Sequence, residues 1–513
     1  MVKKLAIYVL MAVLLVSPIA AAAQGGAQPA QGLPNVDATA IDRFVQAQLG
    51  KAQSPGAAVV VVSGNRVVYA KGFGLADREA GIPATSSTLF ELGSTSKAFT
   101  GLALLQLEQQ GALRLDDPVT RYVPWLRLTY QGQAANVTLA HLLHHTSGVP
   151  FASLASIPID SGEQALEQTV RALSGTELDD LPGDRYQYAT INYDVLGLVI
   201  QEVSGMSYEA YMSRMLQRLG MNDTVPMAQL SDRQGLARGY KIGFGSPRLF
   251  EAPAYRGNTP AGYLLSNADD IGRWLLLQLG TDGMSAGDRE IIERSHRPDT
   301  TVGPDANGTY YAAGWFVSAD GEEWSHQGSN PNFSSYFIAR PQERLGIGVL
   351  ANINSAYTFH IGKGLMSLLR EQEPTPPKAD FYPQLDRIAM GALIIIGVIT
   401  IVLASAAIRI PSQLRRQRRA IAPPQGRRLI GLGAALLLTG AYFWGVGRLL
   451  GTAFAGLPLD VVAVWAPVTV IWLAYALYTV GGIAFLYFVA SWLFPAGKRR
   501  SKPIPPIAAE EVK

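Results

Sequence analysis

The stretch Glu91-Leu92-Gly93-Ser94-Thr95-Ser96-Lys97-Ala98-Phe99-Thr100 places a hydroxyl and an amine three residues apart. We expect a helix from Ser94, because the residues that follow are almost all apolar up to Leu107 and Gly111 is typical of a helix stop. Residues three apart share a helix face, so the Lys97 amine can reach the Ser94 hydroxyl. Burial disfavours a charged ammonium, which makes Lys97 a candidate proton acceptor for a serine nucleophile.

A Ser-x-x-Lys spacing alone is weak evidence, because it arises by chance about once in a chain of this size. Three other segments strengthen it. Residues 181–197 combine a Pro-Gly turn with two alternating tyrosines and then a helix from about residue 193. Residues 324–329 form a short strand carrying a His and a Gly, and residues 140–150 read as a helix end running into a turn.

In this order the motifs resemble the serine β-lactamase and penicillin-binding-protein family, nearest its class C branch, which also holds DD-peptidases, esterases and D-amino-acid peptidases. The family carries Ser-x-x-Lys, then Tyr-x-Asn, then Lys-Thr-Gly or His-x-Gly. The likeness covers about residues 42–370. It implies an α/β (α+β) fold, in which an antiparallel sheet is flanked by helices and joined by a helical subdomain. A small transmembrane helical region would follow.

The resemblance also implies residue roles. Ser94 would be the acylated nucleophile and Lys97 its proton acceptor, and Tyr188 would pass a proton to the leaving group. His326 stands where the family has Lys or His, and we expect it to tune Tyr188 electrostatically and to contact the substrate. The backbone amides of Ser94 and Ser329 would form the oxyanion hole.

The chain departs from the family pattern at Thr190, where Tyr188-Ala189-Thr190 replaces the Asn of Tyr-x-Asn. In the family that amide contacts the lysine and the acyl-side amide of the substrate. A threonine hydroxyl still donates and accepts a hydrogen bond but lacks the two-donor amide. Thr190 and Gly328 remain candidate substrate-binding residues, and the change bears more on β-lactam hydrolysis than on acyl transfer.

Each motif also has a structural alternative. Tyr188 could be a half-buried strand tyrosine, and His326 could satisfy a hydrogen bond in the core. The histidines at 141, 144 and 145 lack the Glu of a His-Glu-x-x-His motif and any supporting thiols or carboxylates. We expect them to brace the loop near Ser147 and predict no metal and no cofactor.

Two functions from different classes stay open. The first is a membrane-anchored serine hydrolase that acts through an acyl-enzyme at Ser94 on a peptide, amide, β-lactam or ester, with a small molecule or a peptidoglycan-like peptide as substrate. The second is a catalytically weak ligand-binding or sensor protein with the same fold. The membrane segments would then anchor the domain or transmit a signal.

Composition limits the chemistry and the compartment. The 513 residues include no cysteine, which excludes disulfides and thiol nucleophiles. Residues 1–23 read as a signal peptide with a basic start, an apolar core and small residues before a cleavage point near Ala23, although an uncleaved anchor is the alternative. Residues 24–385 hold 27 Lys and Arg against 36 Asp and Glu, a net charge of −9, so a nucleic-acid partner has no support.

Two hairpins bracket the expected hydrolase domain at 24–370. Residues 57–62 and 67–70 flank a turn near the start, and residues 333–339 and 345–351 flank another near the end. The family fold would join them into one antiparallel sheet. A terminal helix is expected at about 357–370, and Asp269 with Asp270 should open another helix by placing negative charge at its N-terminus.

The remaining chain is predicted to be a membrane region. A Pro-rich linker at 371–387 precedes three apolar spans at about 388–408, 429–447 and 470–494, with Pro467 near an interfacial entry to the third. The first connection carries seven arginines and no acid, so the positive-inside rule places it and the basic tail at 495–513 in the cytoplasm. We therefore expect a multi-pass protein of the bacterial inner membrane, in contact with lipid, with an extracytoplasmic catalytic domain.

Overall fold

The computed structural model describes residues 37–230, 235–280, 284–377, 379–421, 426–454 and 457–496. The expected signal peptide lies outside the described residues, as does nearly all of the basic tail. The chain divides into two compact units. The first unit comprises residues up to Arg387 together with Gly451–Val468, and the second comprises Ile388–Leu450 and the chain from Thr469.

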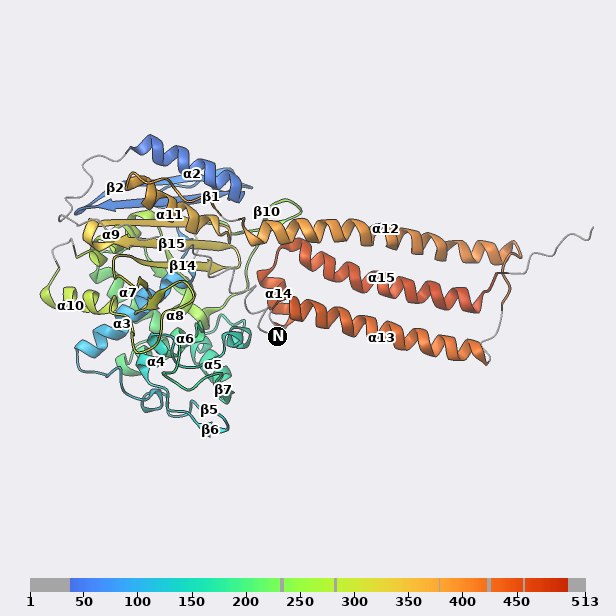
Figure 1. The fold of residues 1–513 in the computed structure, drawn as a ribbon, viewed down its shortest axis with the longest axis horizontal. Coiled ribbons are helices and arrows are strands. Elements are labelled where there is room, and N and C mark those ends of the chain that lie inside the picture. The colour runs from blue at the N-terminus through green and yellow to red at the C-terminus, as the bar shows by residue number, and fades with distance from the viewer. Residues whose placement is uncertain are drawn as a thin grey trace, which may run out of the picture. The chain divides into compact units, whose positions relative to one another are not determined.

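An antiparallel sheet of eight strands forms the frame of the first unit (Figure 1). Strands from the end of the unit pair with strands from its beginning, and Val60 lies opposite Gly348. This confirms that the two hairpins join into one sheet. In spatial order the strands are β12 (Thr309–Tyr311), β13 (Phe316–Ser318), β14 (Trp324–Asn330), β15 (Phe333–Arg340), β16 (Leu345–Ala351), β1 (Gly56–Ser63), β2 (Arg66–Asp77) and β3 (Ile82–Pro83).

The central strands are covered on both faces. Every residue of β1 is buried, and alternate side chains enter two different cores, because successive residues of a strand point to opposite faces. Val59 and Val61 pack with helices α2 (Ala38–Ala52) and α11 (Tyr357–Leu369). The alternate residue Val60 belongs to the larger core, which holds α3 (Lys97–Gln109) and α9 (Ala268–Gln278).

A mostly helical subdomain lies between the two parts of the sheet in the sequence, as expected. Its helices are α4 (Leu139–Leu143), α5 (Ala165–Leu173), α6 (Ile191–Ser204), α7 (Tyr208–Arg218), α8 (Thr259–Gly262) and α10 (Ala286–Ser295). Short strands stabilise its margins: β5 (Leu128–Tyr130), β6 (Gln133–Ala134) and β7 (Thr176–Glu177); β4 (Phe90–Glu91), β8 (Val225–Pro226) and β11 (Leu264–Ser266); and the hairpin of β9 (Tyr240–Gly243) with β10 (Ser246–Leu249).

The start of α9 follows from its local sequence, whereas the start of α3 differs from the expectation. The Asn267 side chain caps α9 by accepting from the Asp270 amide at 2.8 Å, and Asp269 and Asp270 occupy the first turn as expected. The Ser-x-x-Lys segment begins differently from the expectation. Residues Gly93–Ser96 form a 3-10 turn, η1, and α3 itself starts at Lys97.

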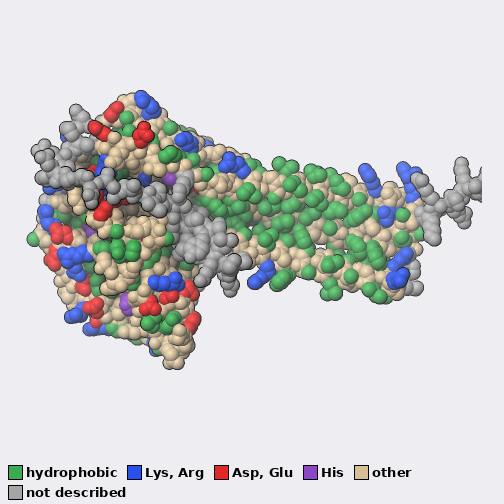
Figure 2. All heavy atoms as spheres, viewed as in Figure 1, with side chains coloured by type: hydrophobic (Ala, Val, Ile, Leu, Met, Phe, Trp, Pro, Cys, Tyr) green, Lys and Arg blue, Asp and Glu red, His purple; other side chains and the backbone are tan. Residues whose placement is uncertain are grey.

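The second unit consists of long apolar helices. Among the described residues, three helices are long and apolar enough to cross a membrane: α12 (Phe381–Arg415), α13 (Arg427–Ala453) and α15 (Val468–Leu493). Figure 2 shows hydrophobic side chains over them, with Lys and Arg gathered at the end where α12 stops and α13 starts. The Pro-rich linker expected at 371–387 ends earlier in the structure, because α12 begins at Phe381. At its other end α12 extends into the arginine-rich connection.

Candidate active site

The site is built around the side chain of Lys97, which is fully buried. Its Nζ lies 3.1 Å from Ser94 Oγ, 3.0 Å from Thr190 Oγ1 and 2.8 Å from the carbonyl oxygen of Ala261. The turn η1 supplies Ser94, the residue before α6 is Thr190, and α8 supplies the carbonyl. The amine therefore joins three segments that are far apart in sequence.

Burial changes the acid-base properties of this amine. Desolvation lowers the pKa of Lys97 to about 7, and the carboxyl of Asp194 partly opposes that shift. The centroids of the Tyr188 and Tyr193 rings lie 5.1 and 5.7 Å from Nζ. Ring faces attract a cation, so these contacts partly replace the water that the buried amine lacks. A substantial fraction of Lys97 is therefore neutral near pH 7 and able to accept a proton.

Tyr188 lies against the nucleophile. Burial raises its pKa above the usual value, and a hydrogen bond with the Ser94 side chain works in the opposite direction. The phenol therefore stays protonated at neutral pH. In this state it can donate to, or relay a proton through, the oxygen of Ser94.

His326 lies on β14 and is neutral. Its Nδ1 is 2.7 Å from the carbonyl oxygen of Gln327, so Nδ1 carries the proton and Nε2 accepts from the Tyr311 hydroxyl at 3.0 Å. Burial lowers its pKa to about 3. The cation over the Tyr188 ring is Lys97, with Nζ 5.1 Å from the ring centroid, and the tuning of Tyr188 by His326 stays a prediction. The hydrogen bond with His326 orients the Tyr311 hydroxyl.

The histidine run before Gly148 supports the site by packing. His141 completes a capping box with Thr138 at α4, and His144 Nδ1 lies 3.0 Å from the Tyr311 carbonyl oxygen. The ring of His145 packs on Tyr188 with centroids 4.3 Å apart. These contacts give each ring a role in bracing, and within the described ranges no group of three metal-ligating side chains occurs.

Two supporting residues were missed by the sequence analysis. Asp194, in the first turn of α6, is fully buried, and burial raises its pKa well above the usual value. The Asn258 amide, with its nitrogen turned toward Asp194, donates to both carboxyl oxygens at 2.8 and 3.1 Å. The available signal was an acidic residue in the first turn of a largely apolar helix, which no motif marks.

Glycine allows the nucleophile to approach the sheet. Gly93 has a φ of +55°, and a Cβ there would lie 2.6 Å from the backbone nitrogen of Ser329. A Cβ on Gly328 would lie 1.9 Å from the carbonyl oxygen of Leu92. The structure thus brings the Ser94 turn beside Ser329, whereas Gly328 serves that close packing and does not line the cavity at the nucleophile.

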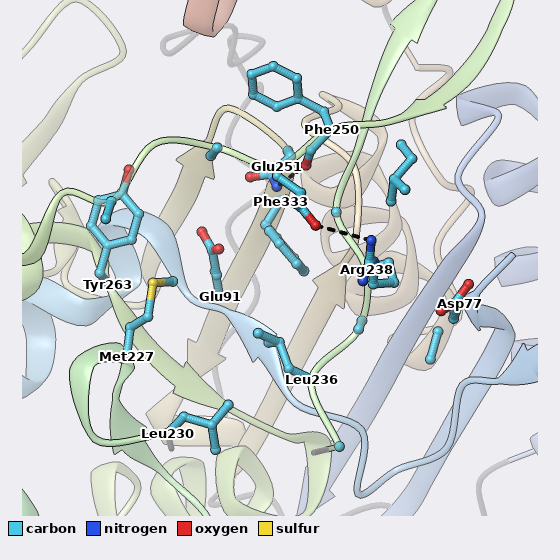
Figure 3. A pocket seen from close by; sticks show the side chains of 18 of the residues that line it. Asp77, Glu91, Met227, Leu230, Leu236, Arg238, Phe250, Glu251, Tyr263 and Phe333 are labelled. Atoms are coloured by element: carbon cyan, nitrogen blue, oxygen red, sulfur yellow. Dashed lines mark hydrogen bonds and ion pairs between the residues drawn. The ribbon is translucent and has the colours of Figure 1, made fainter. Parts of the chain in front are cut away.

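Ser94, Tyr188, Thr190 and Ser329 line a cavity of about 90 Å³. A larger cavity of about 780 Å³ lies elsewhere in the unit (Figure 3). There Glu91 lies near Met227 and Tyr263, and Arg238 pairs with Glu251 at 3.1 Å. We assign the active site to the smaller cavity, because the larger one is not lined by Ser94, Lys97 or Tyr188.

Comparison with known proteins agrees with this fold. Residues 41–363 match the family model named Beta-lactamase. The chain therefore belongs to the β-lactamase family, a group of serine hydrolases of one fold that includes esterases.

The similar proteins include an esterase and a penicillin-binding protein homologue. Protein flp of Staphylococcus aureus (strain N315) is 33% identical over 326 residues, which are 63% of this chain and 65% of flp, less than two thirds of that protein. Esterase EstB of Burkholderia gladioli is 29% identical over 365 residues, 62% of this chain and 91% of EstB. The octameric penicillin-binding protein homologue from Pyrococcus abyssi superposes with a TM-score of 0.58 at 28% identity, covering 69% of this chain and 82% of that one.

The contact of Thr190 with Lys97 can be tested by replacing the hydroxyl. We expect Thr190→Val to lower the rate of Ser94 acylation roughly tenfold, because one hydrogen bond to the amine is lost. Thr190→Ser keeps the oxygen and should retain most of the rate. Stopped-flow acylation by an activated ester measures both, and equal rates for the Val and Ser variants would contradict the assignment.

Proposed function

We propose that this protein is a membrane-anchored serine hydrolase that forms an acyl-enzyme at Ser94. The observation that carries the proposal is the buried Lys97 amine, with a pKa lowered to about 7, at 3.1 Å from Ser94 Oγ. A hydroxyl becomes a useful nucleophile when an adjacent base with a pKa near the working pH removes its proton. The substrate is an ester or amide, a class to which β-lactams and peptides also belong.

The first half of the reaction acylates the serine. Lys97 Nζ accepts the proton of Ser94 as Oγ bonds to the carbonyl carbon of the substrate. The amides of Ser94 and Ser329 stabilise the resulting oxyanion. The bond to the leaving group then breaks, and the leaving group takes up the proton from Lys97 through the Tyr188 hydroxyl.

The second half releases the acyl group. Water attacks the acyl carbon and gives its proton to the same amine, the bond to Ser94 Oγ breaks, and Ser94 recovers a proton. The net change is addition of water across the ester or amide bond. Asp194 is a positioning residue in this scheme, since it acts on Lys97 and holds Asn258 and α8.

Membrane attachment is part of the proposal. Its support is the three helices of suitable length and composition, with an arginine-rich connection between the first two. Positive charge in that connection favours the cytoplasmic side of a bacterial inner membrane. The hydrolase unit would then lie on the extracytoplasmic side.

The nucleophile is tested by a pair of serine variants. We expect Ser94→Ala to lower kcat/KM for p-nitrophenyl acetate by roughly three orders of magnitude or more, because the attacking atom is removed. Ser87→Ala changes an exposed serine and should leave kcat/KM unchanged. Hydrolysis by Ser94→Ala within a few-fold of the parent rate would overturn the proposal.

The base is tested by pH dependence. Only neutral Lys97 accepts a proton, so kcat/KM should rise as pH increases through about 7 and level off above it. A profile from pH 5 to 9 measures this limb, and Lys97→Met should remove both the limb and most of the activity. A parent profile that is flat from pH 5 to 8 would rule out Lys97 as the base.

A further inference from the structure

The connection between the second and third apolar helices folds with the hydrolase. Residues Gly451–Val468 belong to the first unit and include a short helix, α14 (Leu459–Trp465). From the sequence alone we expect only an interfacial entry to the third span here, near Pro467. In the structure Val462, Val464 and Ala466 are buried.

A lysine of the hydrolase holds this segment in place. Lys241, on β9, donates through Nζ to the carbonyl oxygens of Val464 at 2.7 Å and Ala463 at 3.0 Å. These carbonyls lie at the C-terminal end of α14, where a cation is favourable. Asp460 also lies close enough to Tyr255 to add to the effect of burial in raising the pKa of that phenol. The segment is therefore held at the C-terminal end of α14 by two hydrogen bonds from Lys241.

The same segment forms one wall of the cavity at the nucleophile. Phe454, Leu457, Val462 and Trp465 line that cavity together with Ser94. Phe151 and Leu154 of the hydrolase also line it. An acyl group bonded to Ser94 Oγ would therefore extend among apolar side chains.

Two amide side chains of the cavity already donate to partners in the protein. The Asn330 amide nitrogen donates to Glu91 at 2.6 Å and to the carbonyl oxygen of Gly262 at 3.0 Å. The Asn258 nitrogen faces Asp194. A polar acyl group would lose water there and find these two donors engaged, and burial of polar groups without partners is unfavourable.

The size of the cavity limits the acyl group further. Its volume is about 90 Å³. An apolar protein cavity that holds benzene has a volume of about 150 Å³. A group smaller than benzene therefore fits, which corresponds to an acyl chain of about two to four carbons.

We propose that the connection between α13 and α15 is the specificity wall of the active site and selects esters with a compact apolar acyl group. This inference rests on the proposed function and names its substrate class. In the reaction Ser94 Oγ bonds to the acyl carbon, the ester C–O bond breaks, and the alcohol leaves with the serine proton. The hydrocarbon beyond the acyl carbon then contacts Leu457 and Trp465 until water releases the acid.

A chain-length series on the full chain in detergent micelles tests the wall. We expect the parent to hydrolyse p-nitrophenyl acetate and butyrate with the highest kcat/KM and the octanoate at least tenfold more slowly. Leu457→Ala and Trp465→Ala enlarge the cavity, so each should raise the octanoate-to-butyrate ratio about tenfold. Leu457→Phe should change selectivity in the opposite direction, by lowering the butyrate-to-acetate ratio.

Leu459→Ala is the matched control. Leu459 lies on α14, as Trp465 does, but it is 40% exposed and does not line the cavity. It should leave the ratios unchanged. The inference would be overturned if Leu457→Ala and Leu457→Phe gave the same ratios as Leu459→Ala, or if the parent preferred the octanoate. In either case, turnover that depends on Ser94 would still uphold the proposed function. Loss of all Ser94-dependent turnover in the parent would overturn both.

Discussion

Burial of one amine organises this active site. Lys97 is held without exposure to water, and it makes contacts with the Ser94 turn, with the start of α6 at Thr190 and with α8 at Ala261. Burial lowers its pKa to about 7 and so supplies a base near neutral pH. Asp194 limits how far that shift goes, and its hydrogen bonds with Asn258, which precedes α8, and with the Ala261 amide keep α8 in reach of the amine.

The second constraint is the close approach of the nucleophile to the sheet. The first and last strands of the unit, β1 and β16, pair in the interior of the open sheet, and β14 of this sheet lies against η1. Gly93 permits backbone contact with Ser329 that no larger residue would allow without displacement. The oxyanion site in our proposal depends on this contact, so the nucleophile and the sheet act as a single structural element.

Sequence patterns predicted those elements that depend on neighbouring residues in the chain. The hairpins and the terminal helix follow from alternation and turn residues, and the three apolar helices follow from hydropathy. The resemblance also pointed to Thr190 beside Lys97, which the structure places at 3.0 Å. The neutral state of His326, the Asp194–Asn258 pair and the packing of α14 could not be predicted, because each depends on burial and on contacts between distant segments.

The central claim is covalent acyl transfer at Ser94, and intact mass spectrometry of the full chain in detergent tests it most directly. The protein is exposed at pH 8 to p-nitrophenyl acetate or to a penicillin, quenched in acid and mapped by peptide analysis. The account predicts an added acyl mass on the peptide that contains Ser94 and no addition to Ser94→Ala. An acyl group carried by another residue, or turnover by the parent with equal labelling of Ser94→Ala, would contradict it.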